Sequence, residues 1–162
     1  MELDNGMTRF VAGSEDDIFI NRTPVGECRR DLLQLAKRNI GDHFAFVGTT
    51  ESFDRSLVCL SRVLGWPTTY YFSRNLAVKK PGASNEALPE SLISELEERN
   101  SLDRELYEFG VDRLNADCAR FEVDQHDIDS FKASNALRQK RIGPLYDAYS
   151  RFKHIFKRDT PH

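Results

Sequence analysis

The spacing of apolar positions predicts several helices along the chain. In residues 27–40 the apolar side chains fall on one broad helical stripe, and Gly41 follows where a helix end is expected. A second helix is predicted where one phenylalanine and three leucines recur at i, i+4, i+7 and i+11. Gly65 and Pro67 close this second helix, whose stripe consists of Phe53, Leu57, Leu60 and Leu64.

Helical spacing returns in the last half of the chain. Pro89 suits the first position of the helix PESLISELEERN, and Asn100 or Ser101 suits the cap of the helix that follows. A last helix is expected to start at Gly143-Pro144, with an apolar stripe among basic residues. That stripe contains Leu145, Tyr149, Phe152 and Phe156.

Two segments have the pattern of strands. Residues 44–47, FAFV, are apolar on both faces, as in an interior parallel strand covered by helices. Residues 68–75, TTYYFSRN, fit a short edge strand, and the polar loop AVKKPGASNEALP follows. The expected fold class is therefore α/β with αβα layering, predominantly helical with one or two strands.

Composition narrows the possible classes of protein. The 162 residues suit one globular domain, and the net charge of −3 argues against a nucleic-acid binder. Acidic residues concentrate in 86–129 and basic residues in 132–158. Three widely spaced cysteines favour neither a disulfide framework nor a zinc site. The first residues contain no signal peptide or membrane anchor, so we expect a cytoplasmic protein.

The corner between the predicted strand and helix is a candidate binding site. Ligands of αβα sheets bind where strands meet helix N-termini, because free backbone N–H groups point there. Gly48 permits close approach, and Thr49 and Thr50 add hydroxyl groups. The alternative is that Thr50 is an ordinary N-cap followed by ordinary first-turn acids, Glu51 and Asp54. Those acids favour an uncharged nucleobase or ribose edge over a bare phosphate.

Several common chemistries find no support in the sequence. No GxxxxGK[ST] phosphate loop and no GxSxG nucleophile motif occurs, and the four histidines are dispersed. The basic C-terminal helix fits either docking on its own domain or binding to a membrane or polyanion.

Four stretches in order resemble carbohydrate sulfotransferases related to heparan sulfate 2-O- and 6-O-sulfotransferases and their bacterial relatives. They are DNGMTRFVAG (4–13), LAKRNI (35–40), FAFVGTTESFDRSLVCLSRVLGW (44–66) and NSLDRELYEFG (100–110). The resemblance covers about residues 4–114 and implies a P-loop-like αβα fold. It also implies transfer of a sulfuryl group from 3′-phosphoadenosine 5′-phosphosulfate to a sugar hydroxyl.

The resemblance also implies roles for individual residues. Thr49, Thr50, Glu51 and Phe53 are expected beside the donor nucleotide. Arg9 matches a family arginine that could contact a phosphate or sulfate, and a salt bridge fixing the N-terminal segment is the alternative. Two further matching residues, Asp103 and Tyr107, are read as structural.

The family elements that grip the phosphosulfate and supply the catalytic base lie upstream of the matching segments. The chain therefore resembles a C-terminal half, with residues 1–125 as part of a sulfotransferase domain and residues 126–162 as a basic helical tail. We expect it to be inactive alone, with a glycan or other hydroxyl-bearing acceptor and a separately encoded N-terminal half as partners. The alternative function is a non-catalytic module that binds an acidic partner or a membrane surface through the tail.

Overall fold

The structure is a computed structural model that describes residues 4–13, 24, 26–67, 69–72 and 88–157, the last twelve of these by their backbone alone. The described residues form helices connected by irregular segments. The helices are α1 (Gly6–Ala12), α2 (Arg30–His43), α3 (Phe53–Val63), α4 (Glu90–Arg99), α5 (Ser101–Arg120) and α6 (Gln125–Lys157).

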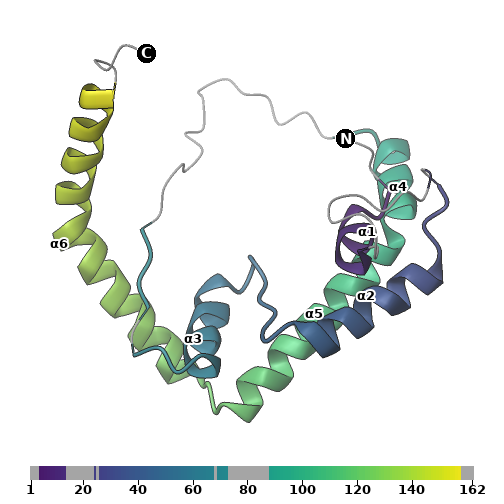
Figure 1. The fold of residues 1–162 in the computed structure, drawn as a ribbon, viewed down its shortest axis with the longest axis horizontal. Coiled ribbons are helices and arrows are strands. Elements are labelled where there is room, and N and C mark those ends of the chain that lie inside the picture. The colour runs from purple at the N-terminus through teal and green to yellow at the C-terminus, as the bar shows by residue number, and fades with distance from the viewer. Residues whose placement is uncertain (1–3, 14–23, 25, 68, 73–87, 158–162) are drawn as a thin grey trace.

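The helices are arranged in an open arc (Figure 1). The long helices α5 and α6 form its two arms and meet at an angle. Helices α1 and α2 pack on each other and on α5, while α3 packs against both α5 and α6. Helix α4 leads directly into the start of α5 and has no buried residue of its own.

The predicted α/β fold class is wrong, because the described residues contain no strand. Residues 44–50 run irregularly between α2 and α3, and residues 69–72 are also irregular. A strand requires a neighbour that shares its backbone hydrogen bonds, and in the part of the chain that the structure describes no strand pairs with residues 44–47. Phe44 is 42% exposed, whereas Phe46 and Val47 pack on two different hydrophobic clusters. The apolar run is therefore a linker between two helical cores.

The larger core joins α1, α2 and α5. Its fully or nearly buried side chains come from the end of α1, from the stripe predicted in residues 27–40 and from the start of α5. Their burial removes apolar surface from water, which is the main force holding these three helices together. The members are Ala12, Leu33, Ala36, Ile40, Leu102 and Leu106.

A smaller core joins α3 to the second half of α5. Cys59, Leu114 and Cys118 are buried there, with Phe46 packed against them. Burial, together with the hydrogen bond to the Cys118 thiol, raises the pKa of Cys59 to about 12. Both cysteines are buried and free in the structure.

Helix α6 begins with a reciprocal capping box. The Asp124 carboxylate accepts the Asp127 N–H at 2.8 Å, and the Asp127 carboxylate accepts the Asp124 N–H at 3.1 Å. Ile128 and Asn135 are then buried against the rest of the protein. The predicted domain boundary at residue 126 falls in this first turn, so the start of the predicted tail is part of the packed structure.

Two predicted helix boundaries differ from the structure. Helix α2 continues through Gly41 to His43, and α6 runs through Pro144 without a new start. A proline removes one backbone donor, and the helix nevertheless continues on both sides of Pro144. Most of the polar loop before Pro89 lies outside the described residues. No described helix combines the length and apolar character required to cross a bilayer.

Candidate functional site

The starts of α1 and α5 cap each other. The Asn5 side-chain oxygen accepts the backbone N–H groups of Leu102 at 2.8 Å and Asp103 at 3.1 Å. The Asp103 carboxylate in turn accepts the N–H groups of Met7 at 2.9 Å and Thr8 at 2.6 Å. Donors at the first turn of a helix have no partner within that helix, so each helix completes the hydrogen bonding of the other.

Arg9 lies in the same cluster, where its guanidinium pairs with the Asp4 carboxylate. Its Nε donates to the Asp4 carbonyl at 2.8 Å, and Nη2 donates to the Pro24 carbonyl at 2.7 Å. Burial alone would raise the pKa of Asp4, but the Gly26 N–H and the Arg9 guanidinium outweigh it and hold the pKa below its usual value. The structure thus gives Arg9 the salt-bridge role and places it outside the wall of the corner hollow described below.

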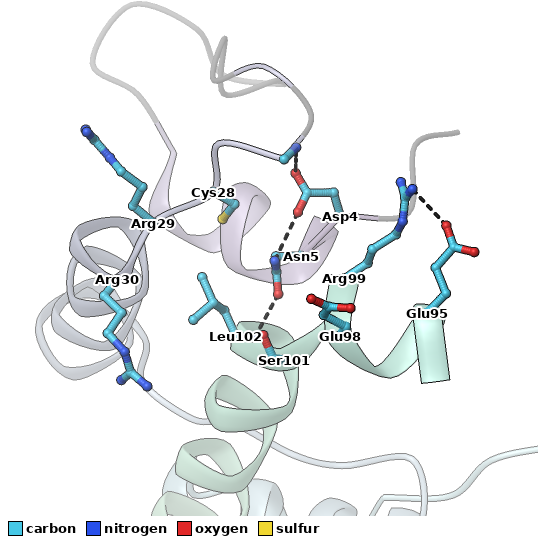
Figure 2. Close-up of a pocket in the computed structure, with 11 residues that line it drawn as sticks. Asp4, Asn5, Cys28, Arg29, Arg30, Glu95, Glu98, Arg99, Ser101 and Leu102 are labelled. Atoms are coloured by element: carbon cyan, nitrogen blue, oxygen red, sulfur yellow. Dashed lines mark hydrogen bonds and ion pairs between the residues drawn. The ribbon is translucent and has the colours of Figure 1, made fainter. Parts of the chain in front are cut away.

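A polar cavity of about 750 Å³ opens beside this cluster (Figure 2). Three arginines line it, and each forms an ion pair with a carboxylate instead of pointing unpaired into the hollow. Positive charge is therefore compensated, and the cavity lacks the surplus of cations that a phosphate or sulfate site needs. The pairs are Arg29 with Asp31, Arg30 with Glu105 and Arg99 with Glu95.

The glycine-threonine corner is held against α3 by close packing. A Cβ atom on Gly48 would lie 2.8 Å from the Ser56 Cβ, so only glycine fits without displacement. The Ser56 hydroxyl accepts the Thr49 N–H at 3.0 Å and donates to the Thr49 carbonyl at 3.2 Å. The sequence suggested that Gly48 lets a ligand approach the backbone; in the structure its close neighbours are the Ser56 and Phe46 side chains, and the element before it is not a strand.

Tyr107 connects the corner to α5. Its hydroxyl donates to Glu51 Oε2 at 3.0 Å, which raises the pKa of Tyr107. The Glu51 backbone N–H and the Tyr107 hydroxyl lower the pKa of Glu51. At neutral pH the pair therefore consists of an ionised acceptor and a protonated donor, which positions the corner instead of moving a proton.

An open hollow of about 290 Å³ lies beside the corner, between the start of α3 and α6. Phe53 lines it and remains 47% exposed, while Lys132 of α6 lies on the opposite wall. Tyr71 contacts Phe53 edge-on at 5.0 Å between ring centroids, and its hydroxyl donates to the Asp54 carboxylate at 2.9 Å. The hollow thus offers an aromatic face, hydrogen-bonding groups and a cation.

The structure brings most of the predicted donor-binding residues together. Thr50, Glu51 and Phe53 line the hollow, and Thr49 lies directly behind them. Sequence reasoning missed Lys132, because residue 132 was assigned to a separate tail. Among the described residues, no group of three histidine, cysteine or acidic side chains is placed to hold a metal ion.

The described residues thus define a helical fold with an open, polar and aromatic site at a helix start. Comparisons of the chain with protein-family models, curated proteins and solved structures found no match. The geometry and the four resembling segments therefore carry the functional argument.

Proposed function

We propose that the chain is the helical, nucleotide-binding part of a sulfotransferase that uses 3′-phosphoadenosine 5′-phosphosulfate and a sugar hydroxyl. The supporting observation is that side-chain hydrogen bonds join all four resembling segments. Asn5 and Asp103 join 4–13 to 100–110, and Glu51 with Tyr107 joins 44–66 to 100–110.

The fourth segment, 35–40, enters the same network through Asn39. The Asn39 amide donates to the carbonyls of Val11 at 3.0 Å and Ala12 at 2.9 Å, which closes the C-terminal end of α1. Four separate chance matches would have no reason to meet through their own polar side chains. Their meeting supports the interpretation of the four segments as one structural unit.

The corner hollow suits the adenosine part of the donor. In the proposed complex the adenine ring stacks on the exposed face of Phe53, and Thr50 and Glu51 hydrogen-bond the ribose hydroxyls. Lys132 reaches a phosphate as a point charge. The two acids at the start of α3 disfavour a bare phosphate on the helix axis itself, which places the nucleotide across the helix start.

The chain does not provide the complete chemistry of sulfuryl transfer. Its 162 residues contain no GxxxxGK[ST] loop to grip the phosphosulfate. The lowered pKa of Glu51 and the raised pKa of Tyr107 make both poor bases at neutral pH. In the proposal, another polypeptide or another segment supplies the grip and the base, and this chain is inactive alone.

Nucleotide binding tests the site directly. Adenosine 3′,5′-bisphosphate, the desulfated donor, should bind with heat detectable by calorimetry, and Phe53→Ala should weaken binding about tenfold through lost stacking. Phe10→Ala is the matched control, because Phe10 is an exposed aromatic of α1 outside the hollow. Absence of binding, or equal binding by both variants, would refute the proposed site.

Transfer assays test the activity. Labelled donor and sugar acceptors should yield no product with the chain alone, and product when a polypeptide with the phosphosulfate loop is added. Transfer by the isolated chain would disprove its inactivity, and absence of transfer in every mixture would remove the catalytic proposal.

A second candidate function is a non-catalytic interaction module. Exposed apolar side chains beside arginines on α6 favour it, because a basic amphipathic helix binds acidic surfaces. Binding to heparin or anionic vesicles that weakens with salt would support this function. Binding that is insensitive to salt would count against it.

A further inference from the structure

Helix α4 and the start of α5 border an open apolar groove of about 500 Å³. Leu88, Ile93 and Tyr107 line it and remain exposed, at 56%, 43% and 39% respectively. Exposed apolar side chains that gather in one groove are typical of a binding surface. Glu97 and Arg104 also line the groove and form an ion pair at 3.1 Å, while α4 as a whole carries four glutamates against one arginine.

The outer half of α6 has a second apolar face without a partner among the described residues. Leu137 is 60% exposed, Ile142 36% and Leu145 70%. At about 100° per residue, these positions fall within an arc of about 140° on the helix. The sequence continues the same spacing through Tyr149, Phe152 and Phe156.

The two faces are complementary in charge. Residues 136–157 contain six lysines and arginines against one aspartate, whereas α4 is acidic. Opposite charges around matching apolar stripes favour pairing of two helices and disfavour pairing of either with itself. Within one chain, however, α4 and the outer end of α6 lie at opposite ends of the arc (Figure 1).

We propose that the outer half of α6 from one copy docks in the α4–α5 groove of a second copy, and that the second copy returns the same contact. This arrangement is a closed two-fold dimer with two identical interfaces, so it does not extend into filaments. In this dimer the acidic partner of the basic helix α6 is helix α4 of the second copy. The proposal is independent of sulfuryl transfer.

Sedimentation analysis of the isolated chain over a range of concentrations tests the dimer. Ile93→Asp in the groove and Leu145→Asp on α6 should each raise the dimer dissociation constant by about tenfold or more, because each puts a charge into an apolar contact. Both side chains are exposed in the single chain, so circular dichroism should show unchanged helix content. Leu64→Asp, at an exposed position on neither face, should dimerise as the unaltered chain does.

Mixing the two variants gives a sharper test. The Ile93→Asp copy retains an intact α6, and the Leu145→Asp copy retains an intact groove, so the mixture can form one unaltered interface. The mixture should therefore dimerise more strongly than either variant alone, and added salt should weaken this dimer.

A chain that remains monomeric at every concentration would overturn the proposal, whether α6 then proves to dock within its own chain or to bind anionic vesicles. Failure of the mixture to dimerise better than its components would overturn the reciprocal contact.

Discussion

The reciprocal caps between α1 and α5 predict a large loss of stability from two small substitutions. Asn5 is buried, and its side-chain oxygen accepts two backbone N–H groups at the start of α5. Asn5→Ala removes a helix cap, worth about 1 kcal/mol, and leaves one buried and one partly buried donor unpaired, at about 1–3 kcal/mol. We therefore expect Asn5→Ala to lower the free energy of unfolding by about 2–4 kcal/mol.

Asp103→Ala should cost less, about 1–2 kcal/mol, because one of the two N–H groups that it frees, that of Met7, is exposed and can bond to water. The double variant should lose less than the sum of the single losses. Both substitutions loosen the same α1–α5 junction, and groups in one hydrogen-bond network couple by about 0.5–3 kcal/mol.

Urea unfolding followed by circular dichroism measures these losses. Asp112→Ala is the matched control, since Asp112 is an exposed acid on the same helix, and it should stay within about 0.5 kcal/mol of the unaltered chain. If Asn5→Ala or Asp103→Ala stayed within that margin, or if the two losses added fully, the reasoning on mutual capping would be refuted.

Three further predictions concern other parts of the chain. Gly48→Ala should cost about 1–3 kcal/mol in the same assay, because the new methyl group would lie 2.8 Å from a side-chain carbon, and a neutral effect would contradict this. The pKa of Asp4 is lowered, so its stabilising contribution is present above about pH 4 and is lost as pH falls through the folded-state pKa. Asp4→Asn should therefore flatten the acid side of the stability curve, and an unchanged acid side would speak against the ion pair. Before the chain is unfolded, a thiol reagent at about pH 8 should label Cys28 but neither Cys59 nor Cys118, because these two are buried. Labelling of all three cysteines in the folded chain would contradict the packing.

Helices with a strong local signal were predictable from the sequence. The stripe beginning at Phe53 and the stop at Gly65 correspond closely to α3, which ends at Val63. The information lay within a dozen residues and required no distant partner. The last predicted helix also exists, but its start was misplaced at Gly143-Pro144. A glycine-proline pair indicates a local break in the pattern, and it does not reveal that the helix continues on both sides.

The strand at residues 44–47 was predicted wrongly for a physical reason. A short apolar run looks the same whether it is buried in a sheet or spans two helical cores, and only the presence of a neighbouring strand decides between them. Phe46 packs on the core around Cys59, and Val47 packs on the core around Leu106. These contacts involve residues far apart in the chain, so no local pattern contains them.

The candidate site was predictable in part for the same reason. Glu51 and Phe53 follow a glycine and begin a helix, which are local features, and both line the hollow. The mutual capping of Asn5 and Asp103 joins residues that are 98 positions apart in the chain. The sequence alone suggested only a structural role for Asp103.

The residues that carry the sulfotransferase resemblance are mainly those that hold the helices together. The polar atoms of four such residues bind backbone groups or form an ion pair within the chain. These residues are Asn5, Arg9, Asn39 and Asp103. A protein that kept this framework and lost its activity would keep these residues as well, because its helices would still need them. Phe53 is different, since it packs edge-on with Tyr71 but stays 47% exposed at the hollow, where a ligand can reach it. Nucleotide binding that depends on Phe53 therefore separates the proposed nucleotide-binding function from that of a helical module without a nucleotide site.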